Sequence, residues 1–418
     1  MLRNLENITN YIMNFKIDSR MKLPNVKSKS TQVEDITLND TTVKQYINEF
    51  WTSGQRQASS LHEISYRACF KPQLPRFFID LLTNEKDVIY DPFSGRGTTP
   101  IESGLWNRNI VSNDVNPISK IFTYPRLFIP TLKEIEERLE NISIDYDVKK
   151  DLDISMFYHK DTESEIVSLR NYLFEKRIGD KEDYIDSWIR MVATNRLTGH
   201  SPGFFSVYTL PPNQAITRER QLKINQDKNQ TPPYRDIKKI IYNKTKSLLK
   251  DVNEDIIHQL KTIENEAQFL EKDARYTQEI ESDSVKLTVT SPPFLNVVQY
   301  SKDNWLRCWF NNLNEKEIEK NITMANNIDD WCYVIQAVFH ELYRITQPGG
   351  WVAFEVGEVN NGKIRLDEYV ADIGLKAKFQ CFGILVNYQN FTKTSNIWGV
   401  KNNSKGTNTN RIVVFHKK

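Results

Sequence analysis

One short stretch, Val88 to Val115, constrains the fold of this chain more than any other. It reads as a strand (VIYDPF), a glycine-containing turn (SGRGTT), a helix (PIESGLW) and a second strand (NIVSNDV). Two strands joined through a helix in this way run parallel in one sheet, with a right-handed crossover. An α/β sheet therefore begins at Val88.

The rest of the chain predicts one α/β domain that is split by an insertion. After Pro130 come long charged helical stretches, TLKEIEERLENI, TESEIVSLRNYLFEKR and DIKKIIYNKTKSLLKDVNEDIIHQL. The sheet pattern resumes with VKLTVTSPPF, a helix near Asp329 to Ile345 that QPGG ends, the strand WVAFEVGEV, and strands around KFQCFGILV and RIVVFH. We predict an α/β domain over 59–130 and 268–418, a largely helical insertion over 131–267, and an N-terminal arm over 1–58 with a helix from about Thr42 to Phe50.

Composition restricts the partners and the compartment. There are 56 Lys and Arg against 54 Asp and Glu, a net charge of +2, so a nucleic-acid interface would have to be a local basic patch. Cys69, Cys308, Cys332 and Cys381 form no CxxC pair, and the six histidines lack zinc spacing. We expect reduced core thiols and no structural metal. The start lacks the features of a signal peptide and no long apolar run occurs, so a cytoplasmic location without a membrane partner is expected.

The glycine turn itself is a candidate ligand site. In DPFSGRGTT, Asp91 to Thr99, Gly95 and Gly97 lie between a strand and a helix, where backbone and ligand can approach closely. Pro100 occupies the third glycine position of a dinucleotide fingerprint, and no Gly-Lys-Ser/Thr follows as in a P-loop. Alone, such a turn is equally often a tight connection between elements.

Three further side chains are predicted to meet this turn. Asp114 ends the second strand, where a carboxylate can accept both hydroxyls of a ribose. Asp273 precedes a short strand, and Ser291 follows the strand VKLTVT. Ligands of open α/β sheets bind at the carboxyl ends of the strands, so Asp91, Asp114, Asp273 and Ser291 are expected to converge on one crevice.

DPFSGRGTT, then NDVNP, then TSPPF together resemble the amino-methyltransferase family, specifically the cytosine-N4 DNA methyltransferases. The resemblance covers roughly 60–125 and 270–418. It implies a Rossmann-like sheet with helices on both faces, S-adenosyl-L-methionine as cofactor and a flipped base in duplex DNA as substrate. It also implies that FSGRG wraps the methionine part, that Asp114 holds the ribose, that Asp273 and Ala274 meet the adenine, and that KPQLP closes over the methionine end. The implied cofactor contacts are Lys71, Pro72, Asp91, Pro92, Phe93, Ser94, Gly95, Gly97, Thr98, Asp114, Asp273 and Ala274.

TSPPF supplies the predicted catalytic residues, Ser291, Pro292, Pro293 and Phe294. Amine methylation requires the exocyclic nitrogen in line with the sulfonium methyl group, with its lone pair withdrawn from the ring, and acceptors aimed at the amino protons provide both. The Ser291 hydroxyl and the Pro292 carbonyl are such acceptors, the prolines stiffen the loop, and Phe294 offers a face to a flipped base. The resemblance assigns the same roles. A proline-terminated strand with a core phenylalanine is the structural alternative.

Ser291 also indicates the target base. Related adenine-N6 enzymes typically have Asp in DPPY at this position, whereas cytosine-N4 enzymes have SPP and an aromatic residue. Cytosine-C5 methylation needs a cysteine nucleophile in a Pro-Cys dipeptide, and no cysteine of this chain follows proline. Cytosine N4 is favoured, within a restriction-modification system and with a cognate restriction endonuclease as the expected partner. The alternatives are an adenine-N6 enzyme, an RNA amino-methyltransferase and a catalytically silent DNA-recognition subunit.

The insertion is the candidate target-recognition domain, although such a domain commonly follows the acidic residue that corresponds to Asp273, and here it precedes it. Its basic residues could neutralise DNA phosphates, and a solvated helix face explains them equally well. The aromatics of GFFSVY are expected in the core. The basic residues are Arg218, Arg220, Lys223, Lys228, Arg235, Lys238 and Lys239, and we select Arg218, Arg220, Lys223 and Arg235 as DNA contacts.

Overall fold

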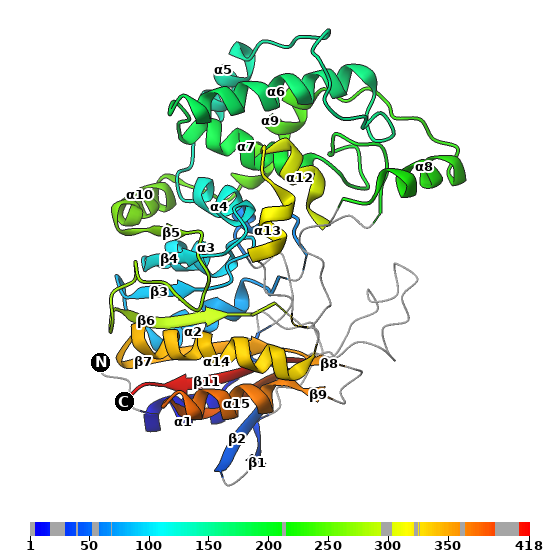
Figure 1. Cartoon of the computed structure of the whole chain (residues 1–418). Coiled ribbons are helices and arrows are strands. Elements are labelled where there is room, and N and C mark those ends of the chain that lie inside the picture. Colours follow the sequence, from blue (N-terminus) through cyan, green and yellow to red (C-terminus); the bar gives the residue numbers. More distant parts are fainter. Residues whose placement is uncertain are drawn as a thin grey trace.

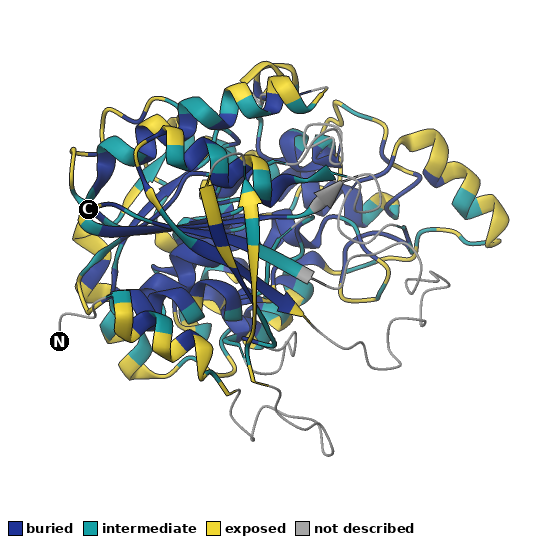
Figure 2. Cartoon of the chain, turned by 90° about the horizontal axis from the view of Figure 1, so that it is seen from below, coloured by how far each residue is buried: buried dark blue, intermediate teal, exposed yellow. Residues whose placement is uncertain are grey.

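The central element is a large twisted sheet with a helical region at one end (Figure 1). The computed structural model describes residues 5–16, 30–38, 41–51, 58–67, 69–210, 215–293, 303–321, 325, 327–359, 364–388 and 409–418. In Figure 2 the strands are mostly buried and the helices expose their outer faces. The core therefore lies on both faces of the sheet.

The sheet has nine strands in the order β1-β2-β10-β11-β7-β6-β3-β4-β5. The strands are β1 Gln32–Leu38, β2 Thr41–Asn48, β3 Val88–Asp91, β4 Asn109–Asn113, β5 Gln268–Leu270, β6 Val285–Thr290, β7 Thr346–Val356, β10 Gln380–Tyr388 and β11 Thr409–His416. A separate pair joins β8 Glu358–Val359 to β9 Ile364–Arg365. β3, β4, β5, β6 and β7 are parallel, and β11 is antiparallel to both of its neighbours. The chain reverses its direction across the sheet between β3 and β6, which is where ligands of open α/β sheets bind.

Helices cover both faces, which confirms the predicted Rossmann-like α/β class. Alternate residues of β7 point to opposite faces, so Phe354 packs with α14 and α15 while Ala353 packs with α1 and α2. α3 follows the glycine turn on the same face as α2. The helices of this part are α1 Leu5–Met13, α2 Gln73–Leu82, α3 Thr98–Leu105, α4 Ile118–Thr123, α14 Ile328–Ile345 and α15 Leu366–Lys376.

The predicted helix from Thr42 to Phe50 is wrong, because this segment forms β2. The side chains of β2 alternate between the two faces, and Val43 and Tyr46 enter the cores on opposite sides of the sheet. β2 pairs in parallel with β10, and the Asn387 side chain accepts hydrogen bonds from the backbone N–H groups of Phe50 and Trp51 at 2.8 and 3.2 Å. The described part of 1–58 therefore extends the central sheet instead of forming a separate arm.

Between β4 and β5 the chain is helical, as predicted. The helices are α5 Leu132–Asn141, α6 Lys160–Ile178, α7 Tyr184–Arg196, α8 Arg218–Asp227, α9 Ile237–Leu248 and α10 Glu254–Ile263, with short 3-10 turns η3 Ser60–His62, η4 Tyr124–Arg126 and η5 Glu264–Glu266 nearby in the fold. Their ends are set by local signals, such as the capping box of Thr131 and Glu134 at α5. Phe204 and Phe205 of GFFSVY are buried, as expected. The domain boundaries at 131 and 267 stay predictions.

The chain that follows TSPPF packs against this helical region. It forms α12 Trp305–Phe310 and α13 Glu315–Asn321, and Leu306 is buried in the same core as Trp188 of α7. The Asp303 carbonyl accepts a hydrogen bond from the Ala215 N–H at 3.0 Å, and the Trp305 indole donates to the Ile216 carbonyl at 3.1 Å. The helical region is thus joined to the sheet domain by packing as well as by the chain.

Two composition-based expectations can be placed in this fold. All four cysteines are free thiols, but only Cys308 is buried, and Cys69, Cys332 and Cys381 are half-buried. Within the described ranges, no helix combines the length and the apolar character needed to cross a membrane.

Candidate active site

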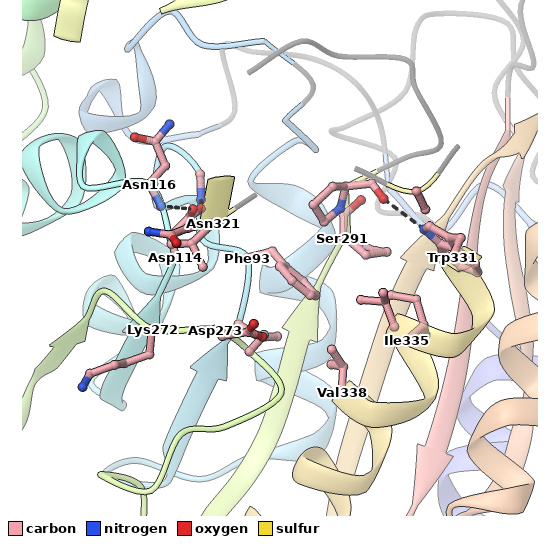
Figure 3. A pocket seen from close by; sticks show the side chains of 18 of the residues that line it. Phe93, Asp114, Asn116, Lys272, Asp273, Ser291, Asn321, Trp331, Ile335 and Val338 are labelled. Atoms are coloured by element: carbon pink, nitrogen blue, oxygen red, sulfur yellow. Dashed lines mark hydrogen bonds between the residues drawn. The ribbon is translucent and has the colours of Figure 1, made fainter. Parts of the chain in front are cut away.

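A crevice opens at the carboxyl ends of β3, β4 and β6 (Figure 3). Of the predicted residues, Pro92, Phe93, Gly95, Asp114, Asp273, Ala274, Ser291, Pro292 and Pro293 line it. In Figure 3, Asp114 and Asp273 lie on one side of Phe93, and Ser291 and Trp331 lie on the other. Asp114, Asp273 and Ser291 therefore line one crevice although they are far apart in sequence, whereas Asp91, which was expected there with them, does not line it.

The two glycines of the turn serve different purposes. Gly95 has φ +53° and lines the crevice, and a Cβ there would meet the Tyr66 ring at 3.7 Å and the Phe93 carbonyl oxygen at 4.0 Å. Gly97 has φ +79°, and a Cβ there would lie 2.3 Å from Thr123 Oγ1 of α4. Gly97 does not line the crevice and is required by packing at the start of α3, whereas Gly95 leaves room for a ligand.

Asp91 anchors the turn beneath the crevice. Its Oδ1 accepts hydrogen bonds from the Thr290 hydroxyl at 2.6 Å and the Phe93 N–H at 3.1 Å, which ties the end of β3 to the end of β6. Its Oδ2 is buried and has no hydrogen-bond partner among the described residues. Burial raises the pKa of Asp91 to about 7. A cationic group nearby would favour the ionised carboxylate.

Ser94 and Thr98 are buried within the turn and do not line the crevice. The Ser94 hydroxyl donates to the Asp91 carbonyl at 3.0 Å and accepts from the Ser112 hydroxyl at 2.9 Å. The Arg96 Nε–H donates to Thr98 Oγ1 at 3.3 Å. Both hydroxyls therefore shape the turn.

Asp114 is held by backbone donors at the end of β4. Its Oδ2 accepts from the Gly95 N–H at 2.8 Å, and its Oδ1 accepts from the Asn116 N–H at 2.9 Å. Burial raises its pKa to about 6, although both backbone hydrogen bonds act in the opposite direction. The remaining lone pairs face the crevice, where two adjacent hydroxyl groups could donate to them.

Asp273 lies in the connection between β5 and β6. The Asn113 side chain fixes this connection by donating to the Lys272 carbonyl at 2.9 Å and accepting from the Lys272 N–H at 3.0 Å. Asp273 forms an ion pair with Arg275 at 2.5 Å. Burial acts to raise the pKa of Asp273, but the bonds to Arg275 outweigh it and hold the pKa below its usual value.

The TSPPF loop is bound on both sides. The Trp331 indole N–H of α14 donates to the Pro293 carbonyl at 3.0 Å (Figure 3). Glu355 of β7 accepts a hydrogen bond from the Ser291 hydroxyl and another from Asn410 Nδ2 at 2.9 Å. Burial raises the pKa of Glu355, and these two hydrogen bonds lower it. Because Ser291 donates to Glu355, the lone pairs of its hydroxyl are free to accept a hydrogen bond from a substrate.

Other predicted residues lie elsewhere. Lys71 and Pro72 do not line the crevice but a neighbouring cavity, which shares Tyr66 with it. Phe294 lies outside the described residues. The individual roles predicted for all of these residues stay predictions.

The predicted DNA contacts do not form one group. Arg218, Arg220 and Lys223 are exposed on α8, which projects from the helical region (Figure 1). Arg235 is partly buried and donates to the Pro202 carbonyl at 3.0 Å. Lys238 donates to the Ile142 carbonyl at 2.6 Å. The solvated-face alternative fits α8, and the last two cations contribute to local structure.

Sequence reasoning missed Tyr66, Asn116, Trp331 and Glu355. Glu355 had a visible signal, since it is the charged residue within the apolar run WVAFEV, and buried charge is often functional. Asn116 follows Asp114 in NDVNP. Tyr66 and Trp331 come from distant segments and had no local signal. Among the described residues, no three His, Cys, Asp or Glu side chains form a group that could hold a metal ion.

Comparisons with known proteins give one family match and matches to solved structures. Residues 3–124 match the model of the DNA methylase family. No curated protein matches the chain. A candidate DNA modification methylase from Thermus thermophilus, solved with S-adenosyl-L-methionine, matches with 19% identity and a TM-score of 0.21 over 35% of this chain and 51% of that one, so the match spans about half of its length.

Two further solved structures match over most of the chain. A SAM-dependent methyltransferase from Methanosarcina mazei has 8% identity and a TM-score of 0.30, over 81% of this chain and 96% of that one. An rRNA methyltransferase from Streptomyces viridochromogenes has 7% identity and a TM-score of 0.31, over 88% of this chain and 91% of that one. At such identities and TM-scores, the matches assign no substrate to this chain.

Proposed function

We propose that this chain is an S-adenosyl-L-methionine-dependent DNA methyltransferase that methylates N4 of cytosine. The observation that carries the proposal is the Ser291 hydroxyl, which lines the crevice and is oriented by the buried carboxyl group of Glu355. The match of residues 3–124 to the DNA methylase family supports DNA as the substrate.

The residues of the crevice fit the cofactor. Asp114 of the crevice suits the ribose hydroxyls, and the Oδ2 of Asp91, buried beneath the crevice without a partner among the described residues, suits the ammonium group of the methionine part. Phe93, Ile335 and Val338 provide apolar surface for the adenine. When bound, S-adenosyl-L-methionine supplies an electrophilic methyl group on a sulfonium centre.

Ser291 and Glu355 would act on the amino group of the base. An amino nitrogen that accepts the methyl group would have to release one proton. Ser291 accepts a hydrogen bond from this amino group while its own hydroxyl donates to Glu355. The negative charge of Glu355 therefore stabilises positive charge on the nitrogen through the Ser291 hydroxyl. Burial raises the pKa of Glu355, which makes it a better final proton acceptor.

The identity of the residue at the start of this loop supports the choice of target base. A hydroxyl backed by a carboxylate replaces the single carboxylate that the resemblance associates with adenine-N6 enzymes. We therefore favour cytosine N4. The proposal extends to target recognition by 131–267, and a restriction-modification context with a cognate endonuclease stays a prediction from the resemblance.

The product identifies the reaction. DNA and RNA from a methylation-free host that expresses the chain are digested and their nucleosides are identified by mass spectrometry. We expect N4-methylcytosine in DNA. N6-methyladenine in DNA would contradict the proposed target base, and methylated nucleosides in RNA alone would contradict DNA as the substrate. If neither nucleic acid were methylated, the chain would be better explained as a catalytically silent DNA-recognition subunit.

A second experiment tests the role of Glu355. Replacing it by Gln (E355Q) keeps the size but removes the negative charge behind Ser291. A hydrogen bond to a charged group contributes about 1.5 to 3 kcal/mol, so turnover should fall on the order of 10- to 100-fold while cofactor affinity measured by calorimetry is unchanged. Asn410→Ala, which removes the other hydrogen bond to Glu355, is the matched control and should reduce turnover less. Equal losses in both variants would make Glu355 structural.

A further inference from the structure

A second cavity lies beside the crevice, with Tyr66 in the wall of both. Its volume is about 870 Å³, within the range of sites that bind whole ligands. One side comes from the segment around η3 and from the glycine turn, and the other comes from α7, α9 and the chain after them. The cavity is therefore built jointly by the sheet domain and the helical region.

Positive charge dominates this cavity. It is lined by five cations, Lys71, Arg96, Arg196, Lys244 and Lys250, and by two carboxylates, Glu63 and Asp251.

Neither carboxylate is available to the deeper cations. Glu63 pairs with Lys250 at 2.6 Å and more loosely with Lys244 at 3.7 Å. Asp251 accepts hydrogen bonds from the Ser60 N–H at 2.9 Å and from its hydroxyl. Within the described part of the chain, Lys71, Arg96 and Arg196 form no ion pair, so three cations of the cavity are left without a carboxylate there.

Arg196, at the end of α7, is the most deeply placed of them. Only 8% of it is exposed, its guanidinium lies over the Phe204 ring at 3.9 Å, and its Nε–H has no hydrogen-bond acceptor among the described residues. Burial lowers the pKa of Arg196 to about 10. The pKa of Lys244 is lowered to about 8 by its own burial and by the nearby charge of Arg196. Both remain protonated at neutral pH. In the described part of the chain Arg196 has no counter-charge, and Lys244 shares Glu63 with Lys250. Because buried cations without full counter-charge are unfavourable, an anionic ligand would stabilise this cluster.

We propose that this cavity binds a backbone phosphate of the DNA strand that carries the target base, with Arg196 and Lys244 as its contacts. This inference rests on the proposed function. A base held beside Ser291 is covalently attached to flanking phosphates, and the cavity with its excess of cations lies directly across Tyr66 from the crevice. A guanidinium with free donors is suited to two phosphate oxygens, and an ammonium adds a point charge. The cavity therefore positions the strand, whereas Ser291 acts on the base.

The test measures the salt dependence of DNA affinity. Binding of a fluorescent duplex to Arg196→Gln and Lys244→Gln is followed by anisotropy across a series of salt concentrations, with Lys133→Gln as the matched control because its side chain is 84% exposed on α5. Each phosphate contact contributes about 0.9 to the slope of log affinity against log salt concentration. Each cavity variant should lose roughly this amount and bind DNA on the order of tenfold more weakly at low salt, whereas Lys133→Gln should match the wild type.

Further measurements separate the possible failures. Thermal melting reports whether each variant folds, and if Arg196→Gln does not, the less buried Lys244→Gln carries the test. Unchanged slopes in folded variants would overturn the proposal. If the same variants also bound S-adenosyl-L-methionine more weakly, the cavity would belong to the cofactor and not to DNA. Calorimetry with inorganic phosphate checks for a small-anion site, and tight phosphate binding with unchanged slopes would also overturn it. If the wild type neither binds nor methylates DNA, the proposed function itself fails.

Discussion

The crevice and the cavity beside it share one tyrosine but differ in charge. The crevice presents Asp114 and Asp273 on apolar walls, above the buried Asp91, whereas the cavity presents cations from both halves of the molecule. The difference matches the two ligands of the proposed reaction, since the methyl donor is a cation and the DNA strand is a polyanion. The comparison teaches that two oppositely charged ligands can bind side by side when each occupies its own cavity and a single residue, here Tyr66, separates the two.

The strongest test of this division is Ser291→Ala, which changes the crevice at the reacting group only. Loss of an acceptor aimed at the amino group should raise the activation free energy by about 2 to 4 kcal/mol, and cofactor affinity should be retained. Turnover is measured by mass spectrometry of the modified nucleoside and affinity by calorimetry. Full turnover in the mutant would remove Ser291 from catalysis.

The glycine turn provides the next test, because its two glycines face different surroundings. Gly97→Ala should lower the free energy of unfolding by about 1 to 3 kcal/mol, since the new methyl group would overlap Thr123. Gly95→Ala would meet the Tyr66 ring and the Phe93 carbonyl only at ordinary contact distances, although φ +53° strains an alanine there. It should therefore destabilise the fold less than Gly97→Ala and, in addition, weaken cofactor binding. The two variants are compared by thermal unfolding and calorimetry. Equal destabilisation would mean that Gly95 has no separate ligand role.

Cofactor binding in the crevice should depend on pH, because Asp91 lies beneath it. The pKa of Asp91 is raised to about 7 in the free protein, so the ionised form that pairs with a cation becomes populated as the pH rises. Cofactor affinity should increase roughly tenfold between pH 6 and pH 8 and level off above it. The same shift makes the ligand-free fold lose stability as the pH rises from about 4 through 7, because ionisation is easier in the unfolded chain. Asp91→Asn should reduce both pH dependences and leave the part that comes from Asp114, whose pKa is raised to about 6. An unaltered profile would contradict the pairing.

The smallest expected effect concerns α8. Reversing Arg218 and Arg220 to Glu together should weaken DNA binding by only a few-fold, because exposed contacts are screened by salt. The loss of salt slope should be smaller than for Lys244→Gln in the same anisotropy assay. A larger loss would move the main phosphate contact from the cavity to the projecting helix.

The sequence predicted the crevice well because local patterns determine it. DPFSGRGTT and TSPPF each begin at the last residue of a strand and contain the functional side chains that follow it, so the α/β rule for ligand position was sufficient to bring them together. The helix predicted over Thr42–Phe50 failed because β2 depends on a partner far along the chain, β10, and on the Asn387 side chain that binds the backbone after it. No local pattern distinguishes such a strand from a short helix.

The basic cavity could not be predicted for a related reason. Arg196 is the last residue of α7, Lys244 belongs to α9, and Arg96 lies in the glycine turn. In sequence each is an isolated cation, and only the packing of α7 and α9 over the sheet domain brings them together. Glu355 is the intermediate case, because its charge inside an apolar strand was visible in the sequence but its hydrogen bond with Ser291 was not.

The packing of α12 against the helical region affects how this molecule could acquire a new specificity. Leu306 shares a core with Trp188, and Asp303 and Trp305 are bound to the backbone of Ala215 and Ile216. A recombination event that exchanged only 131–267 would separate these surfaces and leave apolar side chains uncovered beside the TSPPF loop. Under the proposed recognition role of 131–267, specificity should therefore diverge by substitution within the helical region, or by joint exchange of this region with the chain that follows TSPPF, and not by transfer of the insertion as an independent cassette.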